Sequence, residues 1–257
     1  MFGLPLINGN LKERHSKPAQ ALPSGRAIRR ANLKMNILAI DTAHAAVSAC
    51  VLAGESLLAR ETVPMVRGHG EALLPMIDRV MADAKLAFSS IDRVAVVVGP
   101  GSFTGIRIGI AAARAIGFSN SAPVIGVSSL AAFAAPLLDG RSAGVIAAAI
   151  DAKHGQVYVQ GITAKGQLIL SPTCTKVRDA VRALGAGPLK LTGSGAAMMA
   201  IEAWSMGMEA EVVGETTAPD IKFVARLGGL ADPEQAIARP YYLKAPDAKI
   251  MVASGRG

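Results

Sequence analysis

The sequence predicts an α/β protein of two lobes that share one design, and three observations support this prediction. Residues 39–47 recur at 149–157 with a constant offset of 110, and five of the nine positions are identical. In each half, an apolar segment later runs into a glycine-containing loop and then a helical pattern. Apolar residues make up 51% of the 257 residues and charged residues 18%, which is enough to form a core. A duplication of this kind predicts two mixed sheets, each flanked by helices.

The first half alternates strand-like and helix-like segments. Short apolar runs separated by turn residues predict strands, whereas apolar residues at three- and four-residue spacing predict helices. Strands are expected over 36–40, 45–52, 56–63, 93–98 and 123–127, and helices over 69–81, 106–118 and from Ser128 or Ser129 to a stop at Pro136. In the second half, strands are expected at 161–163, 167–170 and 189–192.

The chain divides into three regions by composition. Residues 1–34 contain seven Lys or Arg and one Glu, a net charge of +6, so the remaining 223 residues carry only +2 of the total of +8. We expect 1–34 to be a basic, disordered extension, 35–139 to form the first lobe and 140–257 to form the second lobe with a C-terminal tail. The near-neutral globular part and its 4% aromatic content argue against a protein that binds single strands by base stacking.

The sequence offers little support for a metal site, a disulfide or a membrane-spanning segment. Cys50 and Cys174 are far apart and in no paired motif, so two reduced thiols are expected, without a further assigned role. The four histidines form no metal-binding pair, and no apolar segment has the length of a membrane span or a secretory signal. We therefore expect a cytoplasmic location, no metal and no membrane contact.

Two short motifs are candidates for ligand binding. Asp41 and Thr42 stand at a strand end, where a carboxylate and a hydroxyl can hold a hydrated metal or a phosphate, or can bond their own turn amides. In the loop from Gly99 to Gly105, glycine amides and two hydroxyls precede a helix, which favours anion binding. The loop lacks the lysine of a phosphate-binding loop, so close packing is the equal alternative. The candidate cofactor-binding residues are Asp41, Thr42, Gly99, Gly101, Ser102, Thr104 and Gly105.

The helix expected over 106–118 is apolar around nearly its whole circumference. Such a helix is buried on more than one side, either within its own chain or against a partner subunit. No Ser–His–Asp or Cys–His signature is present to assign catalysis.

Five segments of the chain stand out as motifs: 35–42 (MNILAIDT), 69–77 (HGEALLPMI), 99–109 (GPGSFTGIRIG), 126–130 (GVSSL) and 239–247 (RPYYLKAPD). Together they resemble the TsaB (YeaZ) family of bacterial tRNA threonylcarbamoyladenosine biosynthesis proteins. The resemblance implies the duplicated actin/Hsp70/sugar-kinase (ASKHA) fold and a non-catalytic relative of the TsaD transferase, whose product is N6-threonylcarbamoyladenosine at position 37 of tRNAs that read ANN codons. It also implies that metal chemistry is lost, because His69 is followed by Leu73 where the catalytic relative has a second histidine.

The implied role is assembly with TsaD and TsaE, with a homodimer when TsaD is absent and tRNA reached only through the complex. No cofactor is expected in this subunit, since ATP and a metal are expected in its partners. The expected interface side chains are Leu73, Met76, Ile77, Val80, Ile106, Ile110 and Ala113, so Ile110→Asp is expected to abolish TsaD binding in a folded monomer. The alternatives are an active ASKHA-type phosphotransferase or a glycoprotease-like (M22) hydrolase that uses Asp41, Ser102 and Thr104, and a regulatory interaction module unrelated to tRNA.

Overall fold

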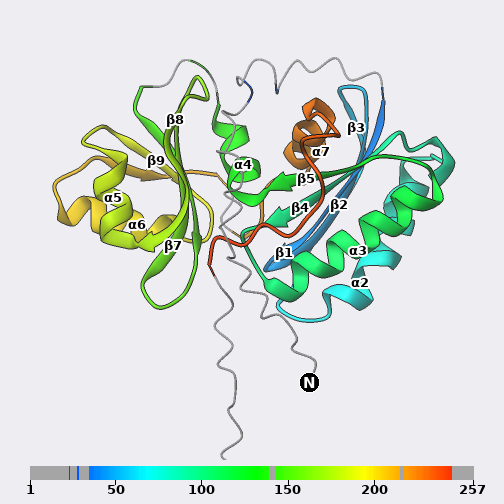
Figure 1. Ribbon diagram of the computed structural model, residues 1–257, viewed down its shortest axis with the longest axis horizontal. Coiled ribbons are helices and arrows are strands. Elements are labelled where there is room, and N and C mark those ends of the chain that lie inside the picture. Colours follow the sequence, from blue (N-terminus) through cyan, green and yellow to red (C-terminus); the bar gives the residue numbers. More distant parts are fainter. Residues whose placement is uncertain are drawn as a thin grey trace, which may run out of the picture.

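The computed structural model describes residues 23, 28, 35–138, 140, 143–214 and 217–244. Figure 1 shows two lobes side by side, each built on one twisted sheet. The first sheet has the strand order β3-β2-β1-β4-β5 and the second has the order β10-β9-β6-β7-β8. If β6 to β10 are matched to β1 to β5 and the second order is read from its other end, the two orders are identical. The expected duplication of an α/β lobe is therefore confirmed.

The first sheet combines an antiparallel meander with two parallel strands. The strands are β1 (Asn36–His44), β2 (Ala46–Ala53), β3 (Ser56–Pro64), β4 (Arg93–Gly99) and β5 (Val124–Ser128). β1 pairs antiparallel with β2 and parallel with β4. β1 and β4 are buried almost throughout, whereas β3 alternates between exposed and half-buried residues, as expected of an edge strand.

The second sheet repeats this arrangement with β6 (Val145–Asp151), β7 (Gln156–Thr163), β8 (Leu168–Lys176), β9 (Leu189–Thr192) and β10 (Ala210–Val212). Helices α5 (Val177–Leu184) and α6 (Ala196–Ser205) cover its outer face. Their buried residues form a smaller hydrophobic core with β6, β7 and β9.

Helices α2 (His69–Asp83) and α3 (Phe103–Ser119) lie side by side on the outer face of the first sheet (Figure 1). Both helices begin after a residue that is suited to a helix N-terminus. Gly68 precedes α2 in a left-handed conformation with φ of 85°, and the hydroxyl of Ser102 accepts a hydrogen bond from the Gly105 amide at 3.2 Å. Because of this cap, α3 begins three residues before the expected Ile106.

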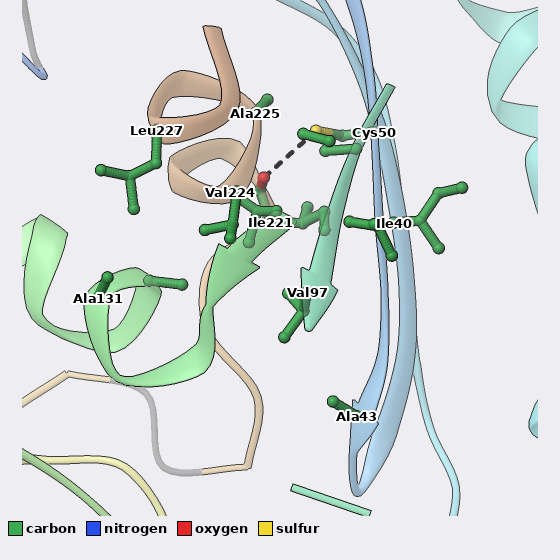
Figure 2. Close-up of a cluster of buried hydrophobic side chains, with 14 of the residues drawn as sticks. Ile40, Ala43, Cys50, Val97, Ala131, Ile221, Val224, Ala225 and Leu227 are labelled. Carbon is green, nitrogen blue, oxygen red and sulfur yellow. Dashed lines mark hydrogen bonds between the residues drawn. The ribbon is translucent and has the colours of Figure 1, made fainter. Parts of the chain in front are cut away.

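Two helices lie between the sheets and join the lobes. α4 (Ser129–Ala134) follows the first sheet but also packs on β6 and β7, whereas α7 (Ile221–Leu230) follows the second sheet and packs on β1, β2 and β4. Figure 2 shows Ile221, Val224 and Ala225 of α7 beside the first sheet, where the Cys50 thiol donates to the carbonyl oxygen of Ile221 at 3.5 Å. Burial strongly raises the pKa of this thiol.

The C-terminal segment returns to the first lobe after α7. Residues 236–244, which we call the strap, bridge to β5 through Ile125 and Ile237. The strap then reaches the end of β4, where the Tyr241 amide donates to the carbonyl oxygen of Val98 at 2.8 Å. The expected C-terminal tail of the second lobe is thus partly a component of the first lobe.

The expected disordered extension, 1–34, lies almost wholly outside the described residues. Ile28 is an exception, because its side chain is fully buried in the main hydrophobic core. At this position the expectation of disorder is wrong. Among the residues that the structure describes, no helix has both the length and the apolar character needed to cross a membrane.

Candidate functional site

A cleft of about 840 Å³ separates the two lobes. The first lobe lines it with the turn between β1 and β2, with His69 at the start of α2, and with Gly101 and Ser102 before α3. The second lobe contributes the corresponding turn around Lys153, together with Ser194 before α6. The duplicated segments thus face the same space, where a ligand can contact both lobes.

The first-lobe turn uses its polar groups for its own structure. Asp41 is fully buried, and its carboxylate accepts hydrogen bonds from the Ala43 amide at 2.8 Å and from Nδ1 of His44 at 3.0 Å. The Thr42 hydroxyl donates to the carbonyl oxygen of Gly105 at 2.6 Å. Asp41 and Thr42 do not line the cleft. Asp41 bonds its own turn amide, as the structural alternative expects, whereas Thr42 bonds the carbonyl of Gly105 instead of a turn amide.

The glycines of the loop before α3 serve close packing against β1. A Cβ atom at Gly101 would overlap the carbonyl oxygen of Ala43, and one at Gly105 would overlap that of Thr42. Gly99 has φ of 108°, and a Cβ there would lie 2.9 Å from the carbonyl oxygen of Tyr241. The loop geometry is thus explained by packing.

The candidate cofactor residues are divided between two places. Gly101 and Ser102 line the cleft, whereas Thr104 and Gly105 line a separate groove of about 660 Å³ beside the start of α2, which Ser102 also borders. Asp41 would have been the carboxylate for a metal–nucleotide complex, but its oxygens are buried in the turn. The first-lobe residues therefore do not fit a metal–nucleotide complex held through Asp41.

His44 is the most unusual polar group of the cleft. Its Nε2 atom is buried and has no hydrogen-bond partner among the described residues, although its Nδ1 is bonded to Asp41. The ring packs edge-on against Phe133 of α4, with centroids 5.2 Å apart. The sequence alone does not single out His44, which is only one of the residues of the repeated segment 39–47.

The corresponding second-lobe turn is more open. Partial burial would raise the pKa of Asp151, but hydrogen bonds from the Lys153 ammonium, at 2.8 Å, and from the Lys153 amide lower it below its ordinary value. The two duplicated carboxylates thus differ, since one is buried beside an imidazole and the other is half-buried beside an ammonium. Nε2 of His69, at the start of α2, donates to the carbonyl oxygen of His44 at 3.0 Å. Within the described residues, no group of three or more His, Cys, Asp or Glu side chains is placed to hold a metal ion.

The side chains expected at a partner interface point into the core. Each of the seven residues, Leu73, Met76, Ile77, Val80, Ile106, Ile110 and Ala113, is at most 4% exposed. This part of the prediction is wrong. In α2 the apolar stripe is the face that packs into the core, and in α3 the nearly all-apolar sequence has no polar side that would identify the inward face. Other residues of the same two helices form the exposed face.

That exposed face consists of small and apolar side chains. We call it the partner face: Leu74 of α2 and Ile108, Ala111, Ala112 and Ala115 of α3. Leu74 is 55% exposed, and Ala111 and Ala115 are exposed one turn apart. Small residues at this spacing allow another helix to approach closely, so the face can accept a helical partner.

Comparison with known proteins agrees with this architecture. A family model described as "TsaD: tRNA N6-adenosine threonylcarbamoyltransferase" matches residues 60–255. The chain belongs to the TsaD family. Within it, the curated TsaB proteins of Haemophilus influenzae and Escherichia coli are each 38% identical over 125 residues, which is 48% of this chain and 52% and 53% of theirs. The chain therefore spans about half the length of these relatives.

A solved structure matches the larger part of the chain. YeaZ from Pseudomonas aeruginosa is 28% identical, with a TM-score of 0.66 over 81% of this chain and 100% of that one. A second Pseudomonas aeruginosa structure, described as similar to peptidase YeaZ, gives the same TM-score at 27% identity. The resemblance to TsaB (YeaZ) and the ASKHA fold are thus confirmed.

Proposed function

We propose that this chain is a non-catalytic, activating scaffold of the bacterial complex that forms N6-threonylcarbamoyladenosine in tRNA. Its partners are TsaD and TsaE, and a second copy of the chain when TsaD is absent. Membership of the TsaD family and the names of the TsaB relatives support the pathway. The observation that carries the assembly role is the exposed apolar partner face on α2 and α3.

The composition of the partner face fits a helical partner of the same fold. Leu74 and Ile108 provide apolar bulk, and the alanines of α3 leave room for the backbone of a facing helix. TsaD has this fold, so its corresponding helices can form a four-helix arrangement with α2 and α3. TsaE then joins at or near the junction.

The state of the cleft supports a role without catalysis. The Asp41 carboxylate and the Thr42 hydroxyl, which a phosphotransferase or hydrolase would need, are bonded within the first lobe. ATP and a metal are therefore assigned to the partner subunits. Tight magnesium-dependent ATP binding by the isolated chain, measured by calorimetry, would favour the phosphotransferase alternative instead.

Gel filtration of the chain mixed with TsaD tests the proposal. Ala111→Glu places a charge on the partner face without disturbing the core, so we expect TsaD binding to weaken at least about tenfold. Ala183→Glu is the matched control, because Ala183 is an exposed alanine on helix α5 of the other lobe. Equal TsaD binding by both variants would contradict the proposed face, and no binding by the wild type would contradict the proposed function.

A further inference from the structure

A second surface lies beside the partner face, where the start of α3 meets the strap. The rings of Phe103 and Tyr242 stack with centroids 5.1 Å apart and an interplanar angle of 26°. The guanidinium of Arg107 lies 3.8 Å from the Phe103 ring centroid, and its Nε donates to the Tyr242 hydroxyl at 3.2 Å. Both aromatic residues are 40% exposed, so two mutually stacked rings and a cation are held together at the surface.

The same surface continues along α3. Arg114 is exposed and donates from Nη2 to the carbonyl oxygen of Ala238 in the strap at 2.8 Å, and Arg239 follows as an exposed residue. Phe118, in the last turn of α3, is 90% exposed. We call this surface the arginine–aromatic ridge: Phe103, Arg107, Arg114, Phe118, Arg239 and Tyr242. Figure 1 shows the strap running toward the start of α3.

Helix geometry places this ridge beside the partner face. Phe103, Arg107, Arg114 and Phe118 follow one another at spacings of four, seven and four, which keeps them on one side of α3. Ala111 of the partner face borders this side between Arg107 and Arg114, whereas Ile108, Ala112 and Ala115 lie farther round the helix toward α2. A partner helix and a second ligand would therefore be neighbours on α3, so binding of each must be measured on the same variants.

The ridge is purely cationic along its two elements. The sequences of α3 and the strap contain neither Asp nor Glu, whereas α2 contains Glu71, Asp78 and Asp83. The near-neutral net charge of the globular part does not reveal this separation of cationic and acidic helices. The low aromatic content likewise does not reveal that three of the ten aromatic residues lie on the ridge.

We propose that the arginine–aromatic ridge binds single-stranded RNA directly, with arginines at phosphates and aromatic rings against bases. Aromatic faces accept any base by stacking, and fixed guanidinium groups match phosphate geometry. An apolar helix would be a poor fit, since it offers no anion to the three arginines of the ridge. The inference rests on the proposed function only for the identity of the RNA, an unpaired tRNA loop that carries the target adenosine. It departs from the expectation that tRNA is reached only indirectly.

Fluorescence anisotropy on the full chain tests this inference. The probe is a labelled RNA hairpin with an unmodified adenosine in its loop, titrated at about 50 mM and about 200 mM potassium chloride. The double variant Arg107→Gln/Arg114→Gln should weaken binding about tenfold or more and reduce the salt slope by about 2, because each phosphate contact contributes about 1. Phe118→Leu removes the 90% exposed ring, so it should weaken binding about threefold to tenfold and leave the slope unchanged.

The control is the double variant Lys165→Gln/Arg182→Gln, which removes two exposed cations from the second lobe. All variants keep the basic residues of 1–34, so any contribution from that region is constant. Circular dichroism melting establishes that each variant is folded. Equal RNA affinity of the ridge and control variants, or no binding of the hairpin by the wild type, would overturn the inference.

TsaD binding by the same variants distinguishes the two proposals. Ridge variants that lose RNA affinity but bind TsaD normally support the inference. Ridge variants that lose TsaD and keep RNA affinity assign the ridge to a protein contact and overturn the inference. A wild type that binds the hairpin but not TsaD leaves the ridge supported and contradicts the proposed scaffold function.

Discussion

Nη1 of Arg93 donates a hydrogen bond to the carbonyl oxygen of Gly228 at 2.9 Å, which joins the first strand after α2 to the end of α7. The same nitrogen lies 3.0 Å from the carbonyl oxygen of Gly229 and 2.9 Å from that of Ala231. The last carbonyls of a helix lack partners within the helix, and a cation at this end also interacts favourably with the negative end of the helix dipole. Arg93 of the first lobe thus binds the C-terminal end of α7, a helix that comes from the second half of the sequence.

Arg93→Met is expected to reduce the free energy of unfolding by about 1.5–3 kcal/mol, because it leaves half-buried carbonyls without a donor. Urea denaturation followed by circular dichroism measures the change. Arg93→Lys should recover part of the loss, since a lysine supplies charge without the planar group. An unchanged midpoint for Arg93→Met would show that the contacts between Arg93 and α7 add nothing to stability.

Two glycine-to-alanine substitutions should have opposite effects. Gly105→Ala places a Cβ atom against the backbone carbonyl of Thr42, so we expect a loss of about 1–3 kcal/mol or more. Gly70→Ala lies in the first turn of α2, where the nearest atom is Cδ1 of Ile108 at 3.7 Å, an ordinary contact. It should stabilise the protein by about 0.4–1 kcal/mol. Thermal melting of the pair checks the sign of each effect.

The ion pair between Glu61 and Arg79 predicts a small dependence of stability on pH. Arg79 donates to the Glu61 carboxylate at 2.7 Å and 3.0 Å, and this hydrogen bonding lowers the pKa of Glu61 below its ordinary value. The folded-state pKa is depressed, so the stabilisation is present at neutral pH and is lost as the pH falls through it. Glu61→Gln should flatten the acid limb of stability against pH, measured by urea denaturation. A limb identical to that of the wild type would contradict this.

Ile110→Asp should fail to fold rather than lose a partner selectively. Ile110 is 4% exposed within the main core, so the substitution buries a carboxylate among aliphatic side chains. We expect a loss of about 4 kcal/mol or more, or an insoluble product. Native-like circular dichroism and a sharp thermal transition would show that this position is more accessible than the structure indicates.

The order of the elements was predictable because apolar periodicity and turn residues determine it locally. The recurrence of Ala39-Ile-Asp41 at Ala149-Ile-Asp151 also indicates the duplication from the sequence alone. Agreement of local pattern with the fold is expected of a natural sequence. The helix after the glycine loop was predicted, although the capping role of Ser102 moves its start to Phe103.

The orientation of α2 and α3 was not predictable to the same degree. In α3 the inward Ile106 and Ile110 and the outward Ile108 are the same residue type, so the inward face is set by tertiary packing alone. The exchange of α4 and α7 between the lobes depends on contacts far apart in sequence. The arginine–aromatic ridge depends on the strap, which brings Tyr242 beside Phe103 across 139 positions.

The most direct test of the account is formation of threonylcarbamoyladenosine on unmodified tRNA, measured by nucleoside mass spectrometry. The mixture contains the adenylate-forming enzyme, TsaD and TsaE, with no added chain, with the wild-type chain, with Ala111→Glu or with Lys153→Ala. The account predicts that the product requires the chain, that Lys153→Ala in the cleft supports formation, and that Ala111→Glu does not. Product formation without the chain, or its loss with Lys153→Ala in a complex that still assembles, would contradict a non-catalytic scaffold.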